Sequence, residues 1–197
     1  MSKRKTSSRQ VPPGCVYELM VSLNFVEPRV WRRLWVPDNL TLAQLHLVIQ
    51  TAMGWTNSHL HEFEIAGKRY EPVDEQAQMH GPAGLDETHV RLTEVLGAEV
   101  ASFMYTYDFG DNWRHTVLIE RRKRVNESIN AWPMCVAGQR ACPPEDVGGS
   151  GGYQDFLEAI GDPAHEEHIA MWRWNGGPFD PNGFDLNRVN AVLRELI

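Results

Sequence analysis

Hydrophobic and polar residues alternate along several stretches of the first part of the chain, which is the pattern of half-buried β-strands. Over residues 16–25 every second residue is apolar, and these side chains share one face of a strand. Residues 30–36 follow as a second strand after a proline-containing break. Residues 61–70 give a hairpin with one apolar face. The clearest alternation covers residues 103–109, with a return strand over residues 115–122. The pattern therefore predicts a sheet assembled from hairpins.

Helical spacing first occurs over residues 42–53, where Leu, Val and Ile recur every three or four positions. Thr41 and Gln44 give a capping-box pattern at the start of this segment, and Gly54 suits its end. Further helices are predicted over residues 92–96, 153–160 and 164–172 and after Asp185. Most of the helices thus follow the strands along the chain.

The order of the elements predicts the fold class. Strands joined by hairpins, followed by helices, are typical of an α+β protein in which helices pack on an antiparallel sheet. Residues 71–90, rich in Gly, Pro, Asp and His, are predicted to form a long loop. Residues 15–197 are expected to form a single domain, preceded by a flexible basic arm over residues 1–14.

The overall composition excludes several classes of protein. Of the 197 residues, 42% are hydrophobic and 23% are charged, which excludes disorder of the whole chain. No apolar stretch reaches the roughly 18 residues that a membrane helix needs. The basic residues near the start are not followed by the apolar core of a secretory signal. The three cysteines are therefore expected to be reduced thiols in a cytoplasmic protein.

Basic residues are concentrated in two places of an otherwise acidic chain, whose net charge is -7. One is the arm over residues 1–14, and the other is the run Arg121, Arg122, Lys123 and Arg124. Phosphate binding is carried mainly by cations, so these segments and an aromatic side chain, Trp113, form the candidate surface for DNA or a protein partner. The competing interpretation is a flexible arm and a solvated strand end without a partner.

The hairpin over residues 103–122 contains the first candidate for chemistry. If Asp111 and Asn112 are the two turn residues, counting outward places Asp108 opposite His115. A carboxylate beside an imidazole raises its pKa and fixes its tautomer, which supports a general base or a metal ligand. The same pair would equally fix the register of the hairpin.

Two further histidines suggest a metal site. His59 and His61 are two residues apart and share a face if both lie on a strand. Together with Asp108 and His115 they would supply the ligands of a divalent metal such as zinc. His61 also shares its face with apolar residues, which is the pattern of a core histidine satisfied by a backbone group.

The segment 142–153 combines two prolines with four glycines and the acids Glu145 and Asp146. It lacks the Lys and Ser/Thr of a phosphate-binding loop, and its acids would repel phosphate. It therefore suits a carboxylate-bearing functional loop, with Glu145 or Asp146 as acid/base, or a rigid structural corner. No G-x-S-x-G nucleophile motif is present.

Several motifs together resemble the plasmid pRiA4b ORF-3-like family. They lie at residues 28–33, 53–55, 59–63, 107–115, 142–153 and 179–181. The resemblance covers residues 15–197 and implies a compact α+β protein linked to plasmids and transposable elements, where some members are labelled resolvases. Serine-resolvase chemistry is rejected here, because Met20 stands where the motif around Ser22 requires Arg.

Two functions follow from the sequence. The first is a non-catalytic binding or accessory protein of mobile-element biology that contacts DNA or a protein partner and needs no cofactor. The alternative is a metal-dependent, hydrolase-like enzyme with a His/Asp site. A bound metal ion distinguishes them, because only the alternative requires one.

Overall fold

The computed structural model describes residues 14–72, 84–124 and 132–196, so the arm predicted over residues 1–14 lies almost wholly outside the described residues. The strands are β1 (Cys15–Leu23), β2 (Trp31–Pro37), β3 (His61–Ile65), β4 (Lys68–Glu71), β5 (Leu85–Asp86), β6 (Ser102–Tyr107), β7 (Trp113–Arg124) and β8 (Met134–Gln139). The helices are α1 (Leu42–Met53), α2 (Leu92–Val95), α3 (Gly149–Gly161), α4 (His168–Trp174) and α5 (Leu186–Leu193). None of these helices is long and apolar enough to cross a membrane.

One eight-stranded sheet forms the body of the protein, in the order β5-β4-β3-β6-β7-β1-β2-β8. The hairpins β1–β2, β3–β4 and β6–β7 are antiparallel, as predicted, which confirms the α+β class. The segment 71–90, predicted as a loop, contains β5, which pairs in parallel with β4. The sequence did not indicate β8, whose buried and partly buried residues do not alternate cleanly.

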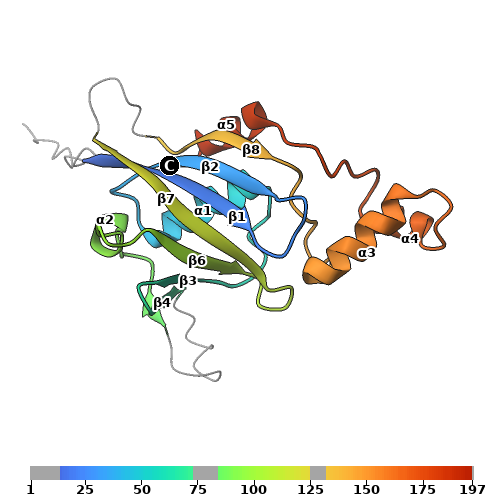
Figure 1. Cartoon of the computed structure of the whole chain (residues 1–197), viewed down its shortest axis with the longest axis horizontal. Coiled ribbons are helices and arrows are strands. Elements are labelled where there is room, and N and C mark those ends of the chain that lie inside the picture. Colours follow the sequence, from blue (N-terminus) through green and yellow to red (C-terminus); the bar gives the residue numbers. More distant parts are fainter. Residues whose placement is uncertain (1–13, 73–83, 125–131, 197) are drawn as a thin grey trace, which may run out of the picture.

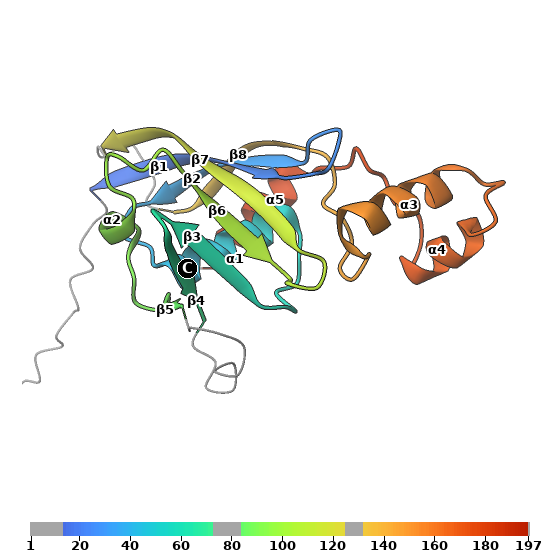
Figure 2. The ribbon, with the colours of Figure 1, turned by 60° about the horizontal axis from the view of Figure 1, so that its bottom comes forward.

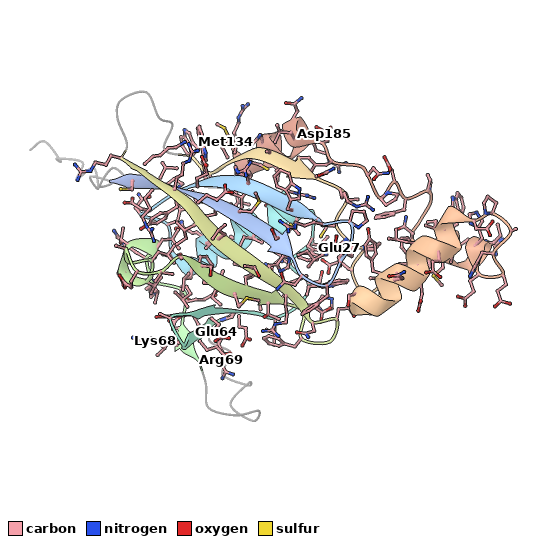
Figure 3. The ribbon with its side chains drawn as sticks, viewed as in Figure 1. Glu27, Glu64, Lys68, Arg69, Met134 and Asp185 are labelled. Carbon is pink, nitrogen blue, oxygen red and sulfur yellow. The ribbon has the colours of Figure 1, made fainter. Side chains whose placement is uncertain are left out.

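The helices occupy two places around the sheet. Helices α1 and α5 lie against the same face of the sheet, whereas α3 and α4 form a pair that projects beyond one end of it (Figures 1 and 2). Asp185 lies at the start of α5, and Glu64, Lys68 and Arg69 lie at the β3–β4 hairpin (Figure 3). The core is the layer between the sheet and α1.

Helix α1 shows how local sequence fixes an element. Thr41 and Gln44 form both hydrogen bonds of the capping box, and Gly54 adopts the left-handed conformation with φ 105°, as predicted. Its apolar stripe packs on the sheet, which buries Leu42, Leu45, Val48, Ile49, Ala52 and Met53. This packing places the segment after Gly54 at a fixed position beside the sheet.

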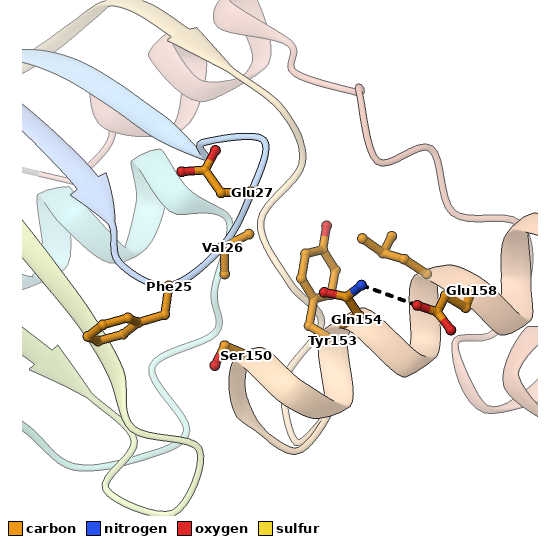
Figure 4. A pocket seen from close by; sticks show the side chains of 8 residues that line it. Phe25, Val26, Glu27, Ser150, Tyr153, Gln154 and Glu158 are labelled. Carbon is orange, nitrogen blue, oxygen red and sulfur yellow. Dashed lines mark hydrogen bonds between the residues drawn. The ribbon is translucent and has the colours of Figure 1, made fainter.

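Helix α3 begins at Gly149, earlier than the predicted start near Tyr153. A hollow of about 210 Å³ separates α3 from the connection between β1 and β2. Figure 4 shows Phe25, Val26 and Glu27 on one side of it and Tyr153 and Gln154 on the other.

Candidate functional site

Three loops bring His59, Asp108 and Asp146 together. His59 lies between α1 and β3, Asp108 follows β6 directly, and Asp146 lies between β8 and α3. Nε2 of His59 is 3.1 Å from Oδ1 of Asp146 and 3.7 Å from Oδ2 of Asp108. Oε2 of Glu145 is 4.0 Å from the same nitrogen. One imidazole nitrogen therefore faces three carboxylates.

Nε2 of His59 is shielded from solvent and has no hydrogen-bond partner among the described residues, since the close Asp146 oxygen lacks hydrogen-bond geometry. One ligand atom each from His59, Asp108 and Asp146 lie within 4.8 Å of one another. Ligand atoms at about 2.0–2.2 Å from a zinc ion are roughly 3–4 Å apart. The three side chains can therefore hold one divalent cation with little movement.

The turn after β6 aims Asp108 at His59. Asp108 adopts a left-handed conformation with φ 54°, which Asp tolerates better than most residues. Its Oδ1 accepts a hydrogen bond from the N–H of Gly110 at 2.9 Å, and its carbonyl accepts one from the N–H of Asn112 at 2.6 Å. These bonds use one carboxylate oxygen for the turn and leave Oδ2 facing His59.

The predicted pairing of Asp108 with His115 is wrong. The hairpin turn spans residues 108–112 rather than two residues, so Tyr105 is the residue opposite His115. His115 is fully buried, and its Nδ1–H donates to the carbonyl of Tyr105 at 3.2 Å. Burial lowers the pKa of His115 to about 4, so it is a neutral core residue.

The predicted site shared by His59 and His61 is also wrong, because His61 points into the core. Its Nε2 is 2.9 Å and 3.0 Å from the two carboxylate oxygens of Glu87, which is itself buried. The ring of His61 stacks on that of His46, with the centroids 3.4 Å apart. His61 is therefore a core histidine, but a carboxylate rather than a backbone group satisfies it.

Helix α1 and the buried histidines position the loop that carries His59. The side chain of Gln50 accepts a hydrogen bond from the N–H of Asn57 at 3.0 Å. Nε2 of His46 lies 2.7 Å from Oδ1 of the same residue. Asn57 adopts φ 56°, a conformation that asparagine tolerates. Two side chains from one helix thus fix the backbone and the side chain of Asn57, two residues before His59.

Glu145 is held beside His59, Asp108 and Asp146 by three hydrogen-bond donors. Its Oε1 accepts hydrogen bonds from the N–H and the hydroxyl of Thr56, at 2.9 Å and 3.0 Å, and from the hydroxyl of Tyr107 at 3.1 Å. Burial and, to a smaller extent, the nearby Glu145 raise the pKa of Tyr107 to about 12. Tyr107 therefore stays a proton donor to Glu145 across the physiological pH range.

The loop that carries Glu145 and Asp146 packs directly against the β6–β7 turn. The N–H of Gly148 donates to Oδ2 of Asp111 at 3.1 Å. A Cβ atom at Gly149 would meet the carbonyl oxygen of Asp111 at 2.7 Å, and Gly149 has φ 70°. Only glycine allows this approach, which sets the distance between Asp146 and Asp108.

We expect Gly152→Ala and Gly151→Ala to change the stability in opposite directions. A Cβ at Gly152 would collide with the carbonyl of Val147, which should lower the free energy of unfolding by about 1–3 kcal/mol. A Cβ at Gly151 would meet no atom within 4 Å, so alanine there should raise the free energy of unfolding by roughly 0.5–1 kcal/mol. Urea unfolding of both variants measures the difference, and equal effects would contradict this packing.

Most basic residues of the run on β7 already have partners within the protein. Arg121 and Lys123 lie 3.6 Å and 3.1 Å from the carboxylate of Glu18. Arg122 donates to two backbone carbonyls, at 2.8 Å and 2.6 Å. Arg121 and Arg124 nevertheless keep exposed side chains at the end of the strand.

Trp113, predicted as an exposed binding aromatic, is buried with 1% of its surface exposed. Its ring packs near that of Trp55, with the centroids 6.1 Å apart. It therefore cannot contact a partner, because it lies in the apolar layer between the sheet and the helices.

The comparisons with known proteins identify the family. The sequence profile of the plasmid pRiA4b ORF-3-like protein matches residues 15–188. The chain belongs to this family. Among curated proteins, the uncharacterized protein y4hQ of Sinorhizobium fredii is 41% identical over 183 residues, which are 92% of each chain.

A solved structure of the same fold is also known. A protein of unknown function from Methanosarcina mazei superposes with a TM-score of 0.78 at 37% sequence identity. The match covers 88% of this chain and 96% of that one. The described fold is thus shared with a protein of unknown function.

The sequence missed several features of the site in this pRiA4b ORF-3-like protein. Of the predicted metal ligands, His59 and Asp108 converge, while His61 and His115 do not join them. Asp146 was predicted with Glu145 as acid/base, and its Oδ1 lies 3.1 Å from Nε2 of His59, so both atoms can bind the same ion. The contacts of Tyr107 with Glu145 join the end of β6 to a loop that is distant in the sequence, and no local pattern indicates them.

Proposed function

We propose that His59, Asp108 and Asp146 bind one divalent metal ion such as zinc, and that the protein is a metal-dependent hydrolase. The observation that supports this proposal is the buried, unpartnered Nε2 of His59, which faces three carboxylates. One imidazole and two carboxylates are ligands that suit zinc and similar ions. Asp146 is largely exposed, which leaves one side of the cluster open to solvent.

The chemistry would divide between the ion and Glu145. A divalent ion with open coordination positions lowers the pKa of a coordinated water and polarises a carbonyl or phosphoryl oxygen. Glu145 has one oxygen held by Thr56 and lies beside the ligands, so it is placed to take a proton from water and return it to the leaving group. Tyr107 orients the carboxylate through its hydroxyl.

Calorimetric titration of Zn²⁺ and Mn²⁺ into the chelator-treated full chain tests the metal site. We expect one ion per chain, with His59→Ala lowering the affinity by at least about 10–100-fold, the loss that removing a mere outer-shell partner of a ligand already causes. His89→Ala, an exposed histidine, is the matched control and should bind normally. A chain that binds neither ion would overturn the proposal and leave His59 as the centre of an ion-pair cluster.

Hydrolysis is tested separately with p-nitrophenyl acetate, p-nitrophenyl phosphate and bis(p-nitrophenyl) phosphate. We expect turnover of at least one substrate that depends on the added metal and is lost in His59→Ala. Metal binding without turnover of any substrate would contradict the hydrolase function but not the metal site.

The second candidate is the accessory function in which Arg121 and Arg124 contact DNA. The observation in its favour is their exposure at the end of β7. A titration of duplex DNA at 50 mM and 200 mM salt, with the full chain and an Arg121→Gln/Arg124→Gln variant, tests it. Salt-sensitive binding that the variant loses would support DNA contact, and equal weak binding would contradict it. Association with mobile elements and a cytoplasmic location stay predictions.

A further inference from the structure

A cavity of about 730 Å³ lies beside His59 and its three neighbouring carboxylates, and one of these, Glu145, lines the cavity. Its walls are the end of α1, the segment 141–145 and the start of α5. Its volume is in the range of sites that bind small organic molecules. Glu145 thus separates a ligand-sized space from His59.

Arg32 gives this cavity a buried positive charge that no carboxylate among the described residues pairs with. It lines the cavity, yet only 2% of its surface is exposed. Its guanidinium donates to four backbone carbonyls, those of Trp31, Ala52, Gln139 and Arg140, at 2.7–2.9 Å. Within the described ranges no carboxylate lies at ion-pair distance from Arg32. A buried cation without an anion is costly, and a nearby anion stabilises it.

A second cation lies at the edge of the same cavity. Arg188 on α5 is exposed, and in the described part of the chain its side chain has no ion pair or hydrogen bond. The carboxylates that line the cavity are already engaged. Asp185 accepts the N–H groups of Asn187 and Arg188 at the start of α5, and Glu145 accepts its three donors. Among the described charged side chains that line the cavity, Arg188 is therefore the one without a partner.

Aromatic side chains supply the remaining surface. The Trp55 indole N–H donates to the carbonyl of Pro143 at 3.1 Å, which fixes the ring. The guanidinium carbon of Arg32 lies 4.2 Å from the centroid of Phe184. Phe179 also lines the cavity. Rings of this kind favour a flat, apolar body over a fully hydrated ion.

We propose that this cavity binds a small organic anion, an aromatic body carrying a carboxylate, sulfonate or phosphate group. The anionic group would lie toward Arg188 and Arg32, and the body against Trp55 and Phe184. Binding itself is independent of the metal ion. The further step, that such an anion is the substrate held next to Glu145, rests on the proposed hydrolase function.

Two fluorescent probes of similar shape test the charge requirement. 8-Anilino-1-naphthalenesulfonate is an aromatic anion, and N-phenyl-1-naphthylamine is its neutral counterpart. We expect the full chain to bind the anionic probe saturably, and Arg188→Gln to weaken that binding about threefold to fivefold, as expected for a partly exposed ion pair. The neutral probe should be unaffected. Arg194→Gln, on the exposed surface of the same helix region, is the matched control and should change neither affinity.

The outcomes separate this proposal from the proposed function. Binding of the anionic probe that is unchanged in Arg188→Gln, or no saturable binding, would overturn the anion site. Equal weakening of both probes would overturn it too, because it would indicate an altered fold or a purely apolar surface. The titrations are repeated with chelator present. Charge-dependent probe binding in a chain that fails to bind Zn²⁺ or Mn²⁺ would retain the anion site and refute the metal-dependent hydrolase.

Discussion

Glu145→Gln will lower metal-dependent turnover about a hundredfold or more, the usual contribution of a general acid–base, while the affinity for Zn²⁺ changes far less. The amide keeps an oxygen that can accept the hydrogen bonds of Thr56 and Tyr107, but it cannot take a proton from water. Steady-state hydrolysis of the most active p-nitrophenyl substrate and calorimetric titration of Zn²⁺ measure the two quantities.

The control for this substitution is Glu158→Gln on α3. Glu158 is exposed, and among the described residues its carboxylate accepts a hydrogen bond from Gln154 alone, so its variant should keep normal turnover. A Glu145→Gln enzyme with unchanged turnover would show that Glu145 only holds the loops together. A parallel loss of metal affinity would instead make Glu145 a ligand.

The free energy of unfolding will fall as the pH is lowered from about 6.5 to about 4, partly because of buried histidines. Burial lowers the pKa of His115 to about 4, and burial together with His61 lowers that of His46 to about 3. The unfolded chain binds protons on these residues from about pH 6.5 downward, and the folded chain does not. Their contribution is therefore complete above pH 6.5 and is lost as the pH falls.

His115→Gln should remove about 3 kcal/mol of this pH dependence, the linkage equivalent of its pKa difference. Urea unfolding at intervals from pH 4 to 7, with chelator present, gives the slope for wild type and variant. His89→Gln replaces an exposed histidine and should leave the slope unchanged. A His115→Gln slope equal to that of the wild type would mean that folding does not lower the pKa of His115.

Local signals were sufficient for the elements whose structure depends on near neighbours. The capping box of Thr41 with Gln44, the Gly54 end and the Asp185 cap of α5 all use contacts within four residues, and each is formed as predicted. The alternation of apolar and polar residues likewise predicted β6 and β7, because successive side chains of a half-buried strand point to opposite faces of the sheet.

The pairing register was not determined locally. Asp111 and Asn112 suit a tight turn, but Asp108 also adopts positive φ, and the turn closes from Asp108 to Asn112 instead. That shift moved His115 opposite Tyr105 and freed Asp108 to face His59. A change of turn length reassigns every cross-strand pair of the hairpin.

The sequence by itself determined the α+β class, the family, most strands and helices, and two members of the cluster, His59 and Asp108. Only the tertiary structure decided that Asp146 joins them and that His61 and His115 belong to the core. The physical reason is distance along the chain. The site is made where three loops far apart in sequence are packed together by close glycine contacts and buried polar side chains, and no local pattern encodes that packing.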